Sequence, residues 1–391
     1  MRRREFLLRA AGLAAGLTLA RRGGSQPGAS AAPDTLAPPP GSAPPPRDDQ
    51  ARRAGHVVTL AVAGDTTLGY NLQTHVDEML EGGVLREYVW PVYPRGIRDV
   101  LDAADLALVN LECPFTERGE KLTKNFNFRA RPELVQILQS ASVDVVTLAN
   151  NHLMDYGREG LEDTIATLDA AKIAWFGAGE KDKVARRPLI LKRNGVRIGF
   201  IGYYFQAAPD MLEPAVMYAQ PRRPGVAGCF EDLDCMRALV REDLKKLVRK
   251  VDAAIPYFHW GKEGSYDVRD YQIELAHLCV DLGARAVLGA HPHRLQGIEV
   301  YRGAPILYSL GNFMFGGNKD PEDKLSMIAR LEIARKGDVE CELVPIQVTT
   351  WPDFPFQPFV LEGDARSAAL ARIAELSRPF ASTLPQFQGS G

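Results

Sequence analysis

The segment VDVVTLANNHLMDYGREGLEDTIATLDAA, residues 143–171, contains the pattern on which a prediction of the fold class can rest. Residues 143–149 are apolar and rich in valine, which indicates a buried strand. Residues 157–171 carry apolar side chains at helical spacing and precede the apolar stretch AWFGAG, residues 174–179. We therefore interpret 157–171 as the connecting helix of a β-α-β unit, a unit typical of α/β proteins.

The same alternation continues on both sides of this unit. We predict further strands in apolar β-rich runs, at residues 56–63, 104–111, 196–204, 252–258, 284–290 and 304–310. Helical spacing predicts helices at residues 132–141, 239–251, 269–284 and 363–380. Residues 325–334 and 340–350 fit an antiparallel edge. The chain is therefore predicted to be an α/β protein with a mixed sheet or two packed sheets.

The first 55 residues differ in composition from the rest of the chain. They begin MRRREFLLRAAGLAAGLTLA, an arginine cluster followed by a short apolar run, and Arg3-Arg4-Glu5-Phe6-Leu7 matches the twin-arginine pattern. We predict a twin-arginine export signal in residues 1–31 and hence a periplasmic, extracellular or cell-envelope location. Residues 32–55 are rich in proline and alanine without apolar periodicity, which predicts a disordered linker.

The overall composition does not favour nucleic acid or an anionic membrane surface as a partner. The 391 residues carry a formal net charge of −2, and 46% of them are hydrophobic, an ordinary globular composition. Nothing in this charge balance favours nucleic acid as a partner, so recognition of a polyanion must be local.

Polar residues of metal-binding types follow several of the predicted strands. Because sites in α/β proteins form beyond the carboxyl ends of strands, residues distant in sequence can converge there. The candidates are Asp65, Glu112, Asn151, His152, His259, His291 and His293.

The residue types in this set agree with one another. Carboxylate, amide and imidazole groups without a thiolate suit manganese, iron, zinc or magnesium. His291 and His293 flank a single proline, and alternate residues of an extended loop project in different directions, so each could face a different ion. We predict a centre for one or two divalent metal ions, in which a carboxylate can bridge two ions.

Each candidate also has an ordinary structural explanation. Asp65 follows a glycine and could form a turn, Glu112 could be a solvated carboxylate at a strand end, and Asn151-His152 could cap the following helix. We favour the metal-binding interpretation because all of these residues occur at the same kind of position.

Several motifs together resemble one known family. The chain contains AVAGDTTLG, LVNLECPFT, FRARPE, LANNHLMDYG, PYFHWGKE, GAHPHRLQG and YSLGNF in this order, between about Val57 and Phe315. In this combination they resemble the bacterial poly-gamma-glutamate capsule-synthesis (CapA) family, which is similar in fold to calcineurin-like metallophosphoesterases. The resemblance implies a two-layer β-sandwich flanked by helices over residues 56–350, with residues 351–391 as a C-terminal extension containing one helix.

The resemblance also implies roles for individual residues. Asp65 would correspond to the metal aspartate of the first strand and Glu112 to the bridging carboxylate. Asn151, His259 and the pair His291 and His293 would correspond to the remaining metal ligands. His152 would act as the acid.

Two positions depart from the phosphoesterase pattern. Thr67 stands where that pattern has a histidine, and the bridging aspartate is replaced by Glu112. Glu263 is an additional carboxylate that could replace a ligand or act as a base. Arg129 is the best candidate to pair with a substrate carboxylate, because its planar fork suits bidentate contact, and Lys124 and Lys262 are weaker candidates of the same kind.

These observations leave three functions open. The first is an exported metal-dependent hydrolase of amide bonds, which would act on poly-gamma-glutamate or a similar anionic polymer alongside membrane-bound synthesis machinery. The second is a non-catalytic polymer-binding component of the capsule machinery. The third is a metallophosphoesterase.

Residues 206–235 lie between a predicted strand and a predicted helix and are expected to form a loop over the site. Cys229 and Cys235 are close enough in sequence to form a disulfide, which the sequence alone neither requires nor excludes. Cys279 is expected to be a buried thiol.

Overall fold

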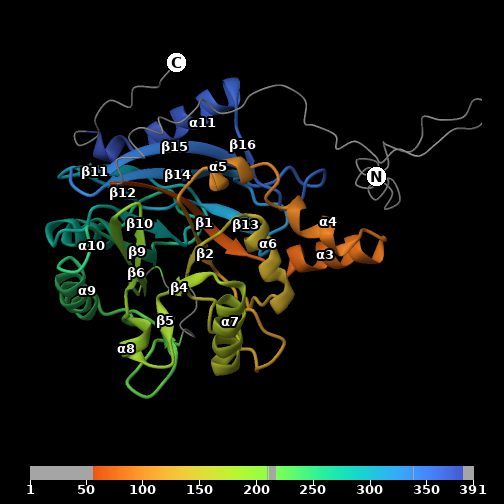
Figure 1. The fold of residues 1–391 in the computed structure, drawn as a ribbon, viewed down its shortest axis with the longest axis horizontal. Helices are drawn as coiled ribbons and strands as arrows, with labels where there is room; N and C mark the ends of the chain where they lie inside the picture. Colours follow the sequence, from red (N-terminus) through yellow and green to blue (C-terminus); the bar gives the residue numbers. More distant parts are fainter. Residues whose placement is uncertain (1–55, 209, 211–216, 338, 382–391) are drawn as a thin grey trace, which may run out of the picture. The chain divides into compact units, whose positions relative to one another are not determined.

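The computed structural model describes residues 56–208, 210, 217–337 and 339–381 (Figure 1). The predicted export signal, residues 1–31, and the predicted linker, residues 32–55, lie outside the described residues. Within the described part of the chain, the strands form an eight-stranded sheet, a six-stranded sheet and a two-stranded sheet.

The eight-stranded sheet is mixed and has the order β16-β15-β14-β1-β2-β3-β4, with β13 paired to the end of β1. Strands β1 to β4 run parallel to one another, whereas β14 and β15 are antiparallel, as the sequence predicted. Its strands are β1 (Val57–Thr67), β2 (Leu106–Leu111), β3 (Val145–Thr147), β4 (Ala174–Phe176), β13 (Asn312–Phe315), β14 (Leu325–Ala334), β15 (Val339–Gln347) and β16 (Phe359–Val360).

The six-stranded sheet has the order β11-β12-β10-β9-β7-β6 and a parallel centre formed by β12, β10, β9 and β7. Its strands are β6 (Leu189–Arg193), β7 (Val196–Phe205), β9 (Ala253–Trp260), β10 (Val287–Ala290), β11 (Ile298–Tyr301) and β12 (Ala304–Leu307). The third sheet contains only β5 (Ala178–Gly179) and β8 (Gly225–Val226).

The two large sheets pack face to face, with helices on their outer faces. Alternate residues of β1, Val58, Leu60 and Val62, lie in the core shared with the six-stranded sheet, whereas Ala61 and Ala63 face the helices on the other side. This period of two follows from the pleat of a strand, and burial of both faces explains why β1 is a continuous apolar run. The predicted α/β sandwich is therefore confirmed.

The helices divide between the two outer faces. Residues of α3 (Asn71–Glu81), α6 (Val135–Ser140) and α7 (Gly157–Ala171) pack against the eight-stranded sheet. Residues of α9 (Leu233–Leu247) and α10 (Asp270–Asp281) pack against the six-stranded sheet. The shorter elements are α4 (Arg86–Val89), η1 (Trp90–Val92), α5 (Arg98–Asp102), η2 (Pro132–Leu134), α8 (Asp182–Ala185) and η3 (Arg378–Phe380), and the C-terminal helix is α11 (Gly363–Leu376).

Helix α9 begins six residues earlier than its apolar spacing predicts. The side chain of Asp232 accepts a hydrogen bond from the backbone nitrogen of Cys235 at 2.9 Å and so caps the first turn. Cys235 also forms a disulfide with Cys229, which ties this turn to the segment before it.

The Cys279 thiol is buried, as predicted. Among the described residues, we find no helix that is both long and apolar enough to span a membrane.

The buried histidine of α3 leads to a prediction about stability. Burial lowers the pKa of His75 to about 4, although Glu78 opposes this shift. In the unfolded chain the pKa is about 6.5, so below this pH the unfolded state binds more protons and the folded state loses stability. We expect His75 to contribute a loss of about 2 kcal/mol between pH 7 and pH 5. Urea unfolding of His75→Gln at both pH values should show a smaller loss than the wild type.

The exposed His56 provides a matched control for this experiment. The variant His56→Gln should lose as much stability as the wild type over the same pH interval. Equal losses for the wild type and His75→Gln would contradict the assigned effect of burial.

Candidate metal centre

The predicted metal ligands meet at the carboxyl ends of strands from both large sheets. Asp65 lies on β1, and Glu112 follows β2 directly. Asn151 lies in the loop after β3, His259 lies on β9, and the His-Pro-His segment, residues 291–293, follows β10. The packing of the two sheets therefore brings together side chains as distant in the sequence as those of Asp65 and His293.

The ligand atoms form two groups that share Glu112. One group consists of Glu112, His259 and His291, and the other of Asp65, Glu112 and His293; within each group these atoms lie within 4.8 Å of one another. Both carboxylate oxygens of Glu112 are buried and have no hydrogen-bond partner among the described residues. A buried carboxylate without hydrogen-bond partners is costly, so this arrangement fits a site in which cations contact Glu112.

Asp65 is held firmly at the centre. Its Oδ1 accepts a hydrogen bond from Asn110 Nδ2 at 2.8 Å, and its Oδ2 accepts one from the backbone nitrogen of His291 at 3.1 Å. Nδ1 of His293 lies 3.2 Å from the same Oδ2. The preceding Gly64 is required here, because a Cβ atom would lie only 1.8 Å from the carbonyl oxygen of Gly311.

His259 lies between the amide of Asn151 and the ring of His291. Its Nε2 is 2.7 Å from Asn151 Oδ1, 2.9 Å from His291 Nδ1 and 3.3 Å from Glu112 Oε1. Its Nδ1 lies 3.2 Å from Asn110 Nδ2, so the ring is held on both sides. The amide oxygen of Asn151 thus joins the group formed by Glu112, His259 and His291 as a fourth possible ligand.

The His-Pro-His loop adopts an unusual backbone. His291 has a φ of 100° and His293 a φ of 53°, and positive φ at such residues costs on the order of 1–3 kcal/mol each. The hydrogen bond from His291 to Asp65 and another from the Gly264 nitrogen to the Pro292 carbonyl at 2.8 Å hold the loop in this form. Such strain is typical of functional sites, where the surrounding structure fixes the backbone.

The electrostatics of the centre favour a positive charge between the two carboxylates. Burial and the charge of Asp65 raise the pKa of Glu112. Burial acts to raise the pKa of Asp65 as well, but hydrogen bonding and the charges of His293 and His259 outweigh it and lower that pKa. Burial acts to lower the pKa of His293, but Glu112 and Asp65 raise it to about 10. Burial and the neighbouring His259 hold the pKa of His291 well below its usual value.

His152 lies beside this cluster in a separate buried network. Its Nδ1 is 2.8 Å from Asp155 Oδ2, and its ring centroid is 4.3 Å from that of Phe128. Burial lowers the pKa of His152, and the Asp155 carboxylate opposes this shift. Because Nδ1 faces Asp155, Nε2 is the nitrogen that remains for a substrate.

Lys124 belongs to the same network, which corrects our sequence-based proposal for it. Its ammonium lies 2.6 Å from Asp155 Oδ1 and donates to the Asn151 carbonyl at 2.9 Å. The Lys124 side chain is only 1% exposed, so it stabilises Asp155 and is not available to a substrate carboxylate.

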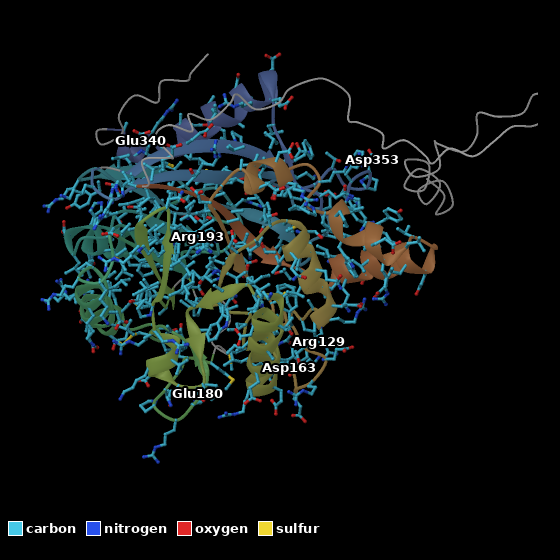
Figure 2. The ribbon with its side chains drawn as sticks, in the orientation of Figure 1. Arg129, Asp163, Glu180, Arg193, Glu340 and Asp353 are labelled. Atoms are coloured by element: carbon cyan, nitrogen blue, oxygen red, sulfur yellow. A yellow bond between two sulfur atoms is a disulfide. The ribbon has the colours of Figure 1, made fainter. Side chains whose placement is uncertain are left out.

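Three further residues from the sequence analysis lie outside the two ligand groups. The Thr67 hydroxyl donates to the Glu112 carbonyl at 3.0 Å, so it supports the backbone. Glu263 is exposed in the loop after β9, and its charge helps to raise the pKa of His293. Arg129 is also exposed (Figure 2). Its guanidinium lies 4.5 Å from the centroid of the Tyr156 ring.

Gln206 and Asn312 also contact the histidines of the site, although the sequence analysis did not select them. Gln206 Nε2 lies 2.6 Å from His291 Nε2 and donates to the Gly261 carbonyl at 2.7 Å. Asn312 Oδ1 lies 2.9 Å from His293 Nδ1, and Asn312 pairs with Asp65 across β13 and β1. Gln206 begins the loop that we expected over the site. The residues that follow it at 209 and 211–216 lie outside the described part of the chain.

The sequence of the chain is similar to those of several known proteins. The chain is 29% identical to the capsule biosynthesis protein CapA of Bacillus anthracis over 76% of this chain and 69% of that protein. It is 29% identical to the PGA biosynthesis protein CapA of Bacillus subtilis, over 75% and 72% of the two chains. It is also 32% identical to a probable polyglutamine synthesis accessory protein of Mycobacterium tuberculosis, over 63% and 67%.

Among solved structures, the chain is similar to the crystal structure of a hypothetical protein from Thermus thermophilus. The TM-score is 0.41 and the sequence identity 15%, over 78% of this chain and 99% of that one. Residues 59–317 match the family described as "Bacterial capsule synthesis protein PGA_cap", and these residues include every predicted metal ligand. The chain therefore belongs to the bacterial capsule synthesis protein family, and it is similar to the CapA proteins of Bacillus.

Proposed function

We propose that this protein is a metal-dependent hydrolase of amide bonds in poly-gamma-glutamate or a similar anionic polymer. One observation carries the proposal: Glu112 is fully buried, both of its oxygens lack hydrogen-bond partners among the described residues, and it is shared by two groups of potential ligands. This donor set of carboxylates, imidazoles and one amide suits manganese, iron, zinc or magnesium.

The residues divide into those that would hold the ions and those that would act on the substrate. Glu112, His259, His291 and Asn151 would hold one ion, and Asp65, Glu112 and His293 a second. A divalent ion supplies a Lewis acid for a substrate oxygen and lowers the pKa of a water molecule. Asn110, Asn312 and Gln206 would orient the ligands by their hydrogen bonds, as outer residues commonly do in metal sites.

His152 would transfer the proton that amide cleavage requires. Asp155 fixes the ring through Nδ1, and Phe128 packs on its face, so Nε2 has a defined direction. In this arrangement the imidazolium form of His152 would donate the proton on Nε2 to the leaving amine and become a neutral imidazole. The Asp155 carboxylate would stabilise the imidazolium form of His152, because opposite charges attract strongly in a buried site.

The names of the relatives support the choice of an anionic polymer as the proposed substrate. Two of them are named for capsule or PGA biosynthesis and a third as an accessory of polyglutamine synthesis. These names support a role in the same kind of pathway, and the partners would be the anionic polymer and the membrane-bound machinery that makes it.

Export through the twin-arginine route is a further part of the proposal. The disulfide between Cys229 and Cys235 supports it, because structural disulfides persist mainly in oxidising compartments. A folded chain exported in this way could carry its metal with it.

A second candidate function is a non-catalytic, polymer-binding component of the capsule machinery. Thr67 favours it, because this residue hydrogen-bonds to the backbone where the phosphoesterase pattern has a metal histidine. The group formed by Asp65, Glu112 and His293 then has fewer side-chain ligands than the other group. The hydrogen-bonded network around His152 favours catalysis instead.

Metal analysis of purified protein tests the centre directly. We expect near-stoichiometric manganese, iron or zinc in the wild type and little in His291→Ala/His293→Ala, because the double variant removes one imidazole from each group. Circular dichroism should show that both proteins are folded. Absence of metal from both, even after reconstitution, would exclude the hydrolase and leave the polymer-binding component.

Activity assays then separate the remaining functions. The metal-loaded protein should cleave γ-glutamyl amides and leave a panel of chromogenic phosphoesters intact. Turnover of phosphoesters that is lost in the double variant would instead establish a metallophosphoesterase.

A further inference from the structure

A small polar pocket lies at the start of α3. It has a volume of about 340 Å³ and is lined by Asn127, Arg129, Tyr156 and residues 70, 71, 73 and 74 at the beginning of the helix. None of these lining residues belongs to the two ligand groups. The pocket is therefore distinct from the candidate metal centre.

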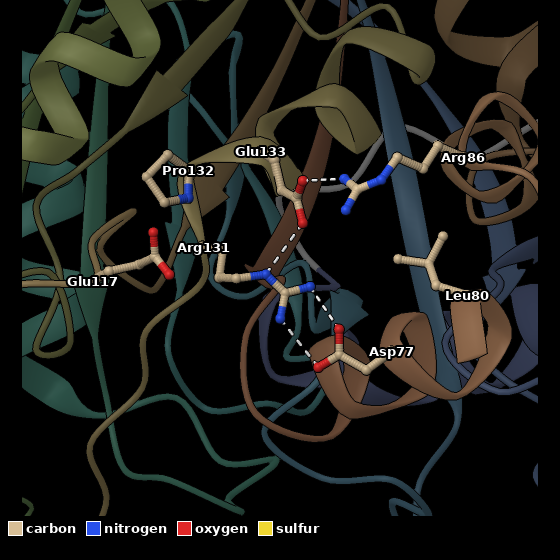
Figure 3. Close-up of a pocket in the computed structure, with 7 residues that line it drawn as sticks. All are labelled: Asp77, Leu80, Arg86, Glu117, Arg131, Pro132 and Glu133. Carbon is tan, nitrogen blue, oxygen red and sulfur yellow. Dashed lines mark hydrogen bonds and ion pairs between the residues drawn. The ribbon is translucent and has the colours of Figure 1, made fainter.

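Arg129 supplies a positive charge to this pocket that no carboxylate among the described residues neutralises. Arg131, two residues further along the chain, forms a bidentate pair with Asp77, with nitrogen–oxygen distances of 2.6 and 3.1 Å (Figure 3). Arg131 also contacts Glu133. Arg129, by contrast, contacts the face of Tyr156, and the described part of the chain gives it no ion pair. Its guanidinium edge can therefore accept a planar anion, which is the geometry that an arginine fork suits.

Asn127 is a second polar residue that lines the same pocket. Its Nδ2 is buried and has no hydrogen-bond partner among the residues that the structure describes. A buried amide nitrogen without an acceptor is costly, so this position is suited to a ligand that brings an oxygen. Arg129 and Asn127 both line the pocket, and a guanidinium and an amide are donors of the kind that bind a carboxylate.

Phe128 connects the pocket to the proposed proton donor. It lies between Asn127 and Arg129 in the chain, its ring packs on His152, and its backbone nitrogen donates to Asp155 Oδ2 at 2.6 Å. The ring of Tyr70 at the edge of the pocket lies 6.0 Å from that of Phe128. The segment that lines the pocket therefore also contacts His152 and Asp155 through Phe128. A polymer unit bound in the pocket would then be a near neighbour, along the polymer, of the unit that reaches His152.

The walls of the pocket are held in a fixed arrangement. The backbone at Gly69 packs so closely against Arg129 that a Cβ atom there would lie 1.9 Å from the Arg129 carbonyl oxygen. The backbone nitrogen of Arg131 also donates to the side chain of Gln73 on α3 at 2.9 Å. Residues 127–131 are thus attached to α3, and the pocket is formed before a ligand binds.

We propose that this pocket is a subsite that binds a pendant carboxylate of the polymer next to the reacting unit, with Arg129 and Asn127 as its donors. The inference rests on the proposed function, because it assumes an anionic polymer as the substrate. It explains how the enzyme would select a chain with a free carboxylate on each unit. The metal centre itself would act on the linkage between units.

Binding of two fluorescent oligomers to the metal-loaded protein tests the subsite. One probe is a short γ-linked glutamate oligomer, and the other is the same oligomer with its carboxylates amidated. We expect Arg129→Gln to weaken binding of the first probe about tenfold or more and to leave the weak binding of the second unchanged. Arg129→Lys should restore only part of the affinity, because lysine keeps the charge and loses the fork. Asn127→Asp should also weaken binding, by repulsion.

The control is Arg158→Gln, which removes an exposed arginine of α7 that pairs with Glu162 at 3.6 Å. This variant should bind both probes like the wild type. Equal binding of the glutamate oligomer by the wild type and Arg129→Gln, or no binding by the wild type, overturns the subsite. Binding that depends on Arg129 without any turnover upholds the subsite and overturns only the hydrolytic function.

Discussion

Replacing Glu112 with glutamine is expected to abolish metal binding and to make the metal-free protein more stable. Loss of a residue that only supports a metal ligand weakens metal binding by up to about a hundredfold. Glu112 belongs to both ligand groups, so its loss should weaken metal binding by more than that. Without metal, the buried carboxylate lacks hydrogen-bond partners, and burial raises its pKa. Glutamine removes this charge, which should stabilise the metal-free protein by about 1–3 kcal/mol.

Thermal unfolding with a chelator and with added manganese measures both effects. The wild type should gain stability when the metal is added, because a ligand that binds only the folded state stabilises it. Glu112→Gln should start from a higher melting temperature and gain almost nothing. Glu340 on β15 is exposed and serves as the control, since Glu340→Gln should behave like the wild type (Figure 2). A Glu112→Gln protein that binds metal normally would disprove the shared-ligand arrangement.

The α/β class was predictable because its signals are local. Buried parallel strands are continuous apolar runs, and the helix at residues 157–171 carries a clear apolar spacing, so both were predicted with nearly correct bounds. The short strands β6 and β13 were not predicted. Strand β13, residues Asn312–Phe315, is recognisable only through its pairing with the end of β1, which is a contact distant in sequence.

Part of the candidate site was also predictable, because the strands that carry it are recognisable in the sequence. Metal-binding residue types at strand ends identified Asp65, Glu112 and the histidines, because strand ends converge in this fold class. Gln206 and Asn312 carry no such signal, since amides are common in loops and at strand ends and the role of each depends on which imidazole lies opposite. The buried environment of Lys124 was also invisible in the sequence, because its partner Asp155 belongs to a different loop, beyond β3.

If the protein cleaves amide bonds as proposed, replacing His152 with glutamine is expected to slow the cleavage about 10²–10⁴-fold, which is the usual contribution of a positioned acid. The variant should keep its metal. His152 is outside both ligand groups, and its Nδ1 faces Asp155. The variant is preferable to a change at Asp155, because Asp155 also holds Lys124 and the backbone of Phe128. Elemental analysis of His152→Gln should give the wild-type metal content, and its affinity for the glutamate oligomer should stay close to that of the wild type.

The leaving group of the substrate shows whether His152 acts as a proton donor. A γ-glutamyl alkylamide has a poor leaving amine that needs a proton, whereas a γ-glutamyl nitroanilide leaves with little help. If His152 donates the proton, the fall in kcat for His152→Gln should be large with the alkylamide and small with the nitroanilide. Equal falls with both substrates would mean that His152 only shapes the site through its packing on Phe128 and its contact with Asp155. Loss of metal from the variant would instead assign His152 to the ligand set, although His152 belongs to neither of the two ligand groups.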